Sequence, residues 1–115
     1  MSHPDYLIFA DLLAKVHSKA FCEKLTPLYY SKAVSLSGLI YESTGELLSY
    51  KTLSAYVRAV LEETPQRINP SIATLGILAH YVNEDDNCRM KNRQEMALYW
   101  YAYRGLMLKK MIVIL

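Results

Sequence analysis

"LLSYKTLSAYVRAVLEETPQRINPSIATLGILAHYV", residues 47–82, predicts two short helices separated by a polar loop that contains proline. Ser49 is the expected N-cap of the first helix, and Thr64-Pro65 is expected to end it. Asn69-Pro70 is expected to open the second helix by the same cap-then-proline pattern. The expected inward side of the first helix consists of Leu53, Val57, Val60 and Leu61, at i, i+4, i+7 and i+8. The expected inward side of the second helix consists of Ile72, Leu75, Leu78, Ala79 and Val82.

Three further helices are predicted outside this stretch. His3-Pro4-Asp5 opens one near the amino end, because proline suits the first helical position and aspartate suits the positive end of the helix dipole. Thr26-Pro27 opens another, which Gly45 closes as a left-handed cap. Good helix formers indicate a fifth helix from Arg89 to about Arg104. The expected apolar sides of the first two are Leu7, Ala10, Leu13, Ala14, Val16 and His17, and Val34, Leu36, Leu39 and Ile40.

Length and composition support a single folded domain. The chain has 115 residues, of which 52% are hydrophobic and 21% are charged, so it can bury one core without disulfides. No strand-rich region interrupts the helical pattern, so we expect an all-α fold, a small five-helix bundle. Within it, residues 24–83 are expected to form a helix-turn-helix-like core, and residues 89–115 a C-terminal aromatic helix. One shared core is expected to contain Leu53, Val57, Leu61, Leu75, Leu78 and Val82.

The charge balance and the cysteines limit the classes of protein. Thirteen Lys and Arg against eleven Asp and Glu leave a net charge of +2, so any basic surface has to be local. The amino end lacks the uninterrupted apolar run of a signal peptide. Cys22 and Cys88 have no neighbouring ligand at zinc spacing and are expected to be free thiols, which favours the cytoplasm.

No pattern of catalytic or metal-binding residues is visible in the sequence. His3, His17 and His80 lack the HxxxH or HExxH spacing that would form a metal pair on one helix, and we expect them in solvent or at the edge of the core. No serine lies in a GxSxG elbow, and no glycine-rich loop precedes a helix. The acidic cluster Glu84, Asp85 and Asp86 lacks the ligand alternation and glycine of a calcium loop, so it is expected to be a solvated connector. We therefore expect no enzyme, no cofactor and no metal site.

The outer side of the helix after Ser49 is small, polar and mildly basic. If Leu53 and Val57 face the core, then Ser49, Lys51, Thr52, Ala55 and Arg58 lie on the opposite side, flanked by Tyr50 and Tyr56. Short side chains let a helix approach the major groove, while Lys and Arg reach phosphates or guanine edges. Arg67 in the following loop is close enough in sequence to contact a backbone phosphate.

Residues 24–82 resemble the helix-turn-helix domains of the Xre and lambda-repressor-like superfamily. The resembling pieces are "SGLIYESTG" as the scaffold helix, "SYKTLSAYVRAV" as the recognition helix and "NPSIATLGILAHYV" as the helix after a loop. The resemblance implies DNA contacts from Ser49, Tyr50, Lys51, Thr52 and Arg58 and a role in transcription regulation. The chain departs from the family in its turn: Gly45 lies four residues before the Ser49 cap instead of two, and Tyr41 replaces the usual alanine. A generic helical hairpin would carry the same caps.

The alternative is a module for protein interaction or self-association. "LYWYAY", residues 98–103, has four aromatic rings in six positions, which must spread around the helix. Trp100 and one or two tyrosines can complete the monomer core. Alternatively, a protein partner or a second copy binds Tyr99, Trp100, Tyr101 and Tyr103.

The apolar end "LMLKKMIVIL" leaves three interpretations open. It can dock on the core, or it can pair with a second copy. If the chain is the soluble part of a longer polypeptide, a transmembrane helix would begin near Met111, and only then is the membrane a partner.

Overall fold

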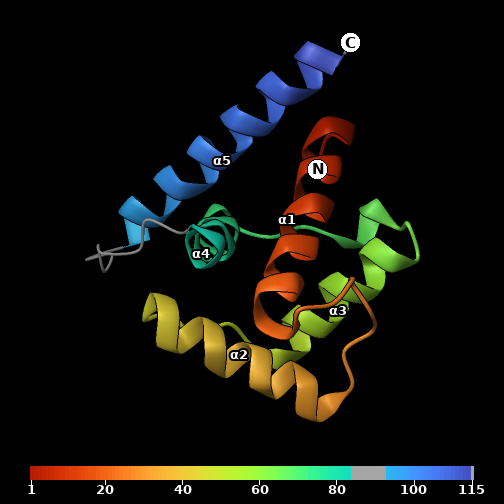
Figure 1. The fold of residues 1–115 in the computed structure, drawn as a ribbon, viewed down its shortest axis with the longest axis vertical. Helices are drawn as coiled ribbons and strands as arrows, with labels where there is room; N and C mark the ends of the chain where they lie inside the picture. The colour runs from red at the N-terminus through yellow and green to blue at the C-terminus, as the bar shows by residue number, and fades with distance from the viewer. Residues whose placement is uncertain (84–92, 115) are drawn as a thin grey trace.

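The computed structural model describes residues 1–83 and 93–114, and the all-α prediction is confirmed. The elements are α1 (His3–Phe21), α2 (Tyr30–Thr44), α3 (Tyr50–Leu61), a short 3-10 helix η1 (Pro65–Arg67), α4 (Ile72–Val82) and α5 (Arg93–Ile114) (Figure 1). Neither described range contains a strand. The acidic cluster Glu84, Asp85 and Asp86 and the thiol of Cys88 lie outside the described residues.

Helix α4 is the centre of the core. It is seen end-on in the middle of Figure 1, with α5 on one side and α1 and α2 on the others. Seven consecutive residues, 75–81, are buried. A helix that is apolar on all sides has to be surrounded by other elements, and α4 satisfies that condition.

Gly76 lets α4 and α5 approach closely. A Cβ atom built on Gly76 would lie 2.0 Å from the carbonyl oxygen of Met96 and 2.4 Å from its carbonyl carbon. Any side chain at this position would therefore push the two helices apart.

Three of the expected helix ends are confirmed. The Ser49 hydroxyl accepts a hydrogen bond from the Lys51 amide at 3.2 Å, so Ser49 is the N-cap of α3. Gly45 closes α2 in the left-handed region, with φ +78°. Helix α1 begins at His3-Pro4, as expected, and its N-cap is Ser2.

Two expected helix starts are wrong. Helix α4 is capped by Ser71, whose hydroxyl accepts from the Thr74 amide at 3.1 Å, because Pro70 precedes the cap instead of following it. Helix α2 begins at Tyr30, not at Thr26-Pro27. The segment before it stays extended because the Leu28 side chain is buried in the core and its carbonyl accepts from the Ser54 hydroxyl at 3.3 Å.

The expected core is confirmed in its centre and wrong at its margins. Leu53, Val57, Leu75 and Leu78 are buried, and the half-buried Val82 packs against them. Leu61 and Ile72 are instead 43% and 46% exposed. Leu61 is rotated about 80° from Leu53, while the buried side of α3 extends the other way, to Ala59. Ile72 is the first residue of α4 and precedes its buried section.

The same correction applies to α1 and α2. Leu7, Val34 and Leu39 were expected inside but are exposed. Ile8 and Phe9 on α1, and Ala33 and Ser37 on α2, face the core instead. Both helices carry apolar residues on more than one side, so helical spacing alone does not identify the buried one.

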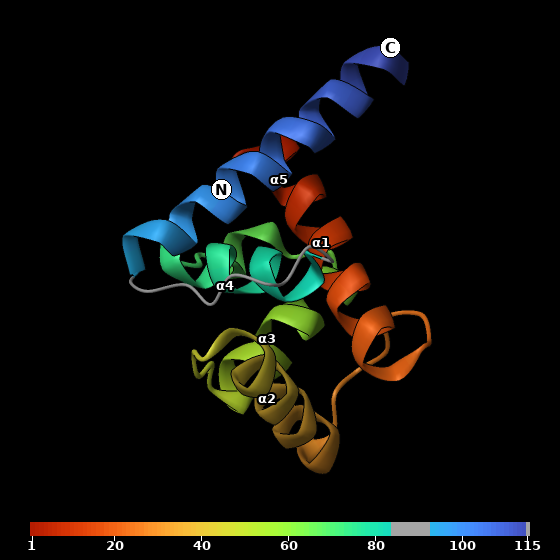
Figure 2. The ribbon, with the colours of Figure 1, turned by 60° about the vertical axis from the view of Figure 1, so that its left-hand side comes forward.

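Helix α5 continues ten residues beyond Arg104, where the local pattern predicts its end, and agrees with the wider range 89–115 expected for the C-terminal aromatic helix. The expected start at residue 89 lies outside the described residues. Gly105 does not end it, since strong helix formers follow. Arg104 Nε lies 2.6 Å from Asp5 Oδ1, which ties the middle of α5 to the start of α1. The last turns of α5 extend beyond the other helices (Figure 2). No helix in the described ranges is both long enough and apolar enough to cross a bilayer.

Candidate nucleic-acid interface

The outer side of α3 is exposed as its spacing predicts. Ser49, Lys51, Ala55 and Arg58 are exposed, and Thr52 is half-buried. Lys51, Ala55 and Arg58 follow at i, i+4 and i+7, so they share one side of the helix, with the two cations roughly 10 Å apart along its axis. The small Ala55 between them leaves the α3 backbone accessible.

A shallow groove runs along this side of α3, and we call it the α3 groove. It consists of two adjoining hollows of about 250 and 200 Å³, which share Leu28, Ser54 and Arg58. One wall is α3, and the other is the extended segment before α2, held in place by the hydrogen bond from Ser54 to Leu28. The first hollow is also lined by Tyr30, Ala33, Tyr50, Lys51 and Ala55, and the second by Pro27, Leu61 and Glu62.

Two cations line the groove, Lys51 in the first hollow and Arg58 where the two hollows meet. Neither Lys51 nor Arg58 forms an ion pair with any residue that the structure describes. Arg67, by contrast, pairs with Glu62, with Nη1 3.6 Å from Oε2. The end of the groove near Glu62 is therefore neutralised, while the two α3 cations are available to an external anion.

The groove brings together some of the expected contact residues and not others. Tyr50, Lys51 and Arg58 line it, whereas Ser49, Thr52 and Arg67 are not among its lining residues. The ring of Tyr50 lies edge-on to Tyr30, with centroids 5.2 Å apart. Sequence reasoning missed Leu28, Tyr30 and Ser54 as lining residues.

Most of the aromatic residues of α5 belong to the monomer core. Trp100 is 4% exposed, so the interpretation that it completes the core is confirmed. Tyr99 packs its half-buried ring on His80, with centroids 4.4 Å apart. The Tyr103 hydroxyl donates to Asp11 Oδ2 at 2.5 Å, and burial together with this bond raises the pKa of Tyr103. Tyr101 is 52% exposed, so any partner surface on α5 has to include Tyr101 instead of Trp100.

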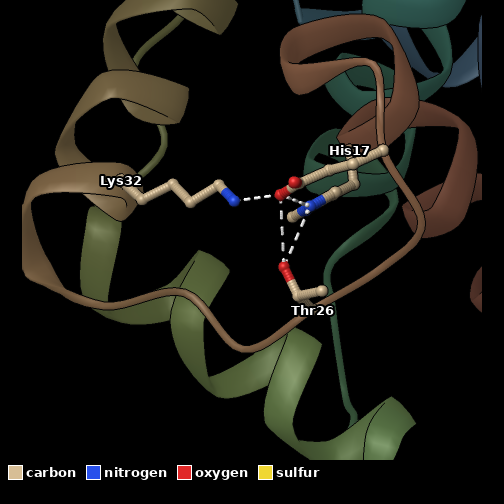
Figure 3. Close-up of polar contacts among 4 residues, drawn as sticks. His17, Thr26 and Lys32 are labelled. Atoms are coloured by element: carbon tan, nitrogen blue, oxygen red, sulfur yellow. Dashed lines mark hydrogen bonds and ion pairs between the residues drawn. The ribbon is translucent and has the colours of Figure 1, made fainter.

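A polar cluster that sequence reasoning did not find ties the end of α1 to the start of α2 (Figure 3). His17 Nε2 lies 3.0 Å from Glu23 Oε1, and the Thr26 hydroxyl lies 3.3 Å from each of these atoms. The Lys32 ammonium also binds this carboxylate. The hydrogen bond from Lys32, followed by that of His17, lowers the pKa of Glu23 to about 2. We call these four residues the Glu23 clamp.

The Glu23 clamp positions one wall of the α3 groove. Glu23 and Thr26 belong to the extended segment that continues to Leu28, so the clamp holds one end of this segment and Ser54 holds the other. His17 and His80 are each 1% exposed, which corrects the expectation that they lie in solvent or at the core edge. His17 Nδ1 has no hydrogen-bond partner among the described residues. The ring therefore acts through Nε2, as a structural contact.

Within residues 1–83 and 93–114, no group of three His, Cys, Asp or Glu side chains could hold a metal ion. Comparison with protein-family models, with curated proteins and with solved structures gives no match to this chain.

Proposed function

We propose that the chain is a non-catalytic, helix-turn-helix-like domain that binds double-stranded DNA along the α3 groove and acts in transcription regulation. The observation that carries the proposal is the pair Lys51 and Arg58. They are exposed on one side of α3, two helical turns apart, and form no ion pair with the described residues. The exposed free thiol of Cys22 fits a reducing compartment such as the cytoplasm.

The chemistry of this side of α3 suits the phosphate backbone. Lys and Arg that neutralise phosphates release condensed counterions, which drives association. The positive end of the α3 dipole lies next to Lys51 and adds to the attraction for an anion. Ala55 leaves space for the sugar-phosphate chain between the two cations.

The second wall of the groove limits how α3 can approach DNA. Leu28 and Tyr30 stand beside the helix, so α3 is not an isolated ridge that can enter the major groove to full depth. We therefore expect phosphate and sugar contacts to outnumber base-edge contacts, and we expect modest sequence specificity. The hydroxyls of Tyr30 and Tyr50 are available as additional donors to phosphate oxygens.

Nuclear magnetic resonance mapping tests the location of this interface. Addition of a short duplex to the ¹⁵N-labelled chain should shift amide signals of residues 49–58 and of Leu28 and Tyr30 most strongly. Shifts that concentrate on α5 or on the α1 carboxyl end would contradict the proposal.

Matched charge variants test the mechanism. Lys51→Ala and Arg58→Ala should each weaken duplex affinity by roughly threefold to tenfold, as expected for the loss of a contact of about 1 kcal/mol. Lys24→Ala removes an exposed lysine that lines neither hollow of the groove and should leave the affinity nearly unchanged. Equal losses in all three variants would mean that only net charge matters.

A further inference from the structure

The side of α5 that faces away from the core carries large apolar residues. Met96 and Trp100 point inward, and their side of the helix continues through Tyr103 and Met107. The opposite side, which we call the α5 outer face, consists of Leu98, Tyr101, Ala102, Gly105, Lys109 and Ile112. Leu98, Tyr101 and Ile112 are each more than half exposed. Because the last turns of α5 project beyond the other helices, part of this face stands clear of the body (Figures 1 and 2).

Two apolar residues of the α5 outer face lie at equal distances from Gly105. Leu98 precedes Gly105 by seven residues, and Ile112 follows it by seven. Two antiparallel α5 helices crossing at Gly105 would place Leu98 of each copy against Ile112 of the other. Any two-fold antiparallel pair brings together residues that are equally distant from its axis, and with Gly105 on the axis these residues are both apolar.

Gly105 itself has no steric role inside the monomer. A Cβ atom there would meet nothing within 4 Å, unlike the one on Gly76. Glycine in a helix interior is unfavourable relative to alanine, and at the centre of the α5 outer face it allows a second helix to approach closely.

Lys109 would favour an antiparallel pair of α5 helices over a parallel one. In a parallel, in-register pair, the Lys109 ammonium groups of the two copies would face each other across the contact, which is repulsive. In the antiparallel pair, Lys109 lies level with Tyr101 of the other copy, where a cation over an aromatic ring is attractive. The contact between Lys109 and Tyr101 therefore favours the same antiparallel register as the contact between Leu98 and Ile112.

We propose that α5 is a self-association surface through which two copies of the chain pair antiparallel about Gly105. The 22 residues of α5 span about 33 Å, and only one side of the helix is free. The contact is thus at the small end of specific interfaces, which bury about 800 Å² per partner. We expect a dimer that forms in the micromolar range. This inference is independent of DNA binding.

Sedimentation velocity and light scattering over a concentration series test the association. The mass should rise from 13.2 kDa toward twice that value as concentration increases. Ile112→Glu should remain monomeric, because it places a carboxylate in the apolar contact. Leu47→Glu is the matched control, since Leu47 and Ile112 are both 70% exposed and Leu47 lies in the α2–α3 turn. A chain that is monomeric at all concentrations, or a dimer insensitive to Ile112→Glu, would overturn the proposal.

Disulfide trapping tests the orientation. In a chain carrying Cys22→Ser and Cys88→Ser, the single variants Leu98→Cys and Ile112→Cys should cross-link when mixed and stay monomeric when oxidised separately. Efficient cross-linking of Leu98→Cys with itself would show a parallel pair and overturn the register. A chain that remains monomeric but binds phosphatidylcholine–phosphatidylglycerol vesicles through Ile112 would show that lipid, not a second copy, covers this face.

Discussion

At the scale of single residues, the contact between Gly76 and the Met96 carbonyl sets the spacing of α4 and α5. Gly76→Ala would place Cβ 2.0 Å from that oxygen, so α5 must move. We expect the free energy of unfolding to fall by about 1–3 kcal/mol, as for overpacked cores. Urea denaturation followed by circular dichroism measures this change.

Gly38→Ala is the matched control for Gly76→Ala. Gly38 lies inside α2, and a Cβ atom there meets nothing within 4 Å. Alanine should therefore stabilise the protein by about 0.5–1 kcal/mol. Equal effects of the two substitutions would mean that α4 and α5 are not in backbone contact.

The Glu23 clamp should make the free energy of unfolding depend on pH in the acidic range. Because the folded-state pKa of Glu23 is lowered to about 2 from 4.5, its contribution to stability is complete above about pH 4.5. The contribution is lost as pH falls from there toward 2. Glu23→Gln should flatten the dependence of unfolding free energy on pH in this window.

Glu42→Gln serves as the control for Glu23→Gln, since Glu42 is an exposed glutamate of α2 outside the clamp. Urea unfolding at several pH values between 2 and 7 compares the two variants with the parent chain. If both variants keep the full acid dependence, the carboxylate of Glu23 does not support the fold.

At the scale of elements, two leucines of α3 fit the expected apolar spacing, but Leu53 is buried and Leu61 is exposed. Leu53→Ala removes a fully buried side chain and should lower the free energy of unfolding by about 2–5 kcal/mol. Leu61→Ala alters the exposed last residue of the same helix and should change it by no more than about 0.5 kcal/mol. Thermal and urea unfolding measure both changes. A large destabilisation by Leu61→Ala would contradict the assignment of Leu61 to the exposed side of α3.

A helix end can be predicted from the sequence when neighbouring residues determine it, and cannot when a contact with a distant helix determines it. The start of α3 and the end of α2 depend on local chemistry, a Ser49 hydroxyl acceptor and a left-handed Gly45, and both were predicted. The start of α2 depends on Leu28, which a distant helix holds extended, and no local pattern reports that contact. The end of α5 lies beyond Arg104 because the strong helix formers after Gly105 outweigh the cost of a single glycine in the helix.

Some residues of the α3 groove could likewise be predicted from the sequence, and others could not. Lys51 and Arg58 follow from the periodicity of α3, because residues opposite a buried stripe face outward. The wall formed by Leu28 and Tyr30 could not be predicted, since it requires the folded path of the segment before α2. Trp100 and Tyr101 adjoin in sequence, and only packing against α4 distinguishes the buried ring from the exposed one.

At the scale of the whole molecule, the two proposed surfaces lie on different sides of α4. Helices α3 and α5 are well separated in both ribbon views (Figures 1 and 2). At concentrations where the chain is monomeric, Ile112→Glu should therefore bind duplex DNA as tightly as the parent chain. Fluorescence anisotropy with a labelled duplex measures this, and a large loss of affinity would mean that the two surfaces are coupled.

The central claim is that Lys51 and Arg58 neutralise DNA phosphates, and the salt dependence of binding measures this most directly. The logarithm of the association constant should fall linearly with the logarithm of salt concentration, with a slope of about −0.9 for each phosphate neutralised. Lys51→Ala and Arg58→Ala should each reduce the magnitude of that slope by about one, while Lys24→Ala should leave it unchanged. No measurable binding at low salt, or a slope that neither α3 variant alters, would contradict the claim.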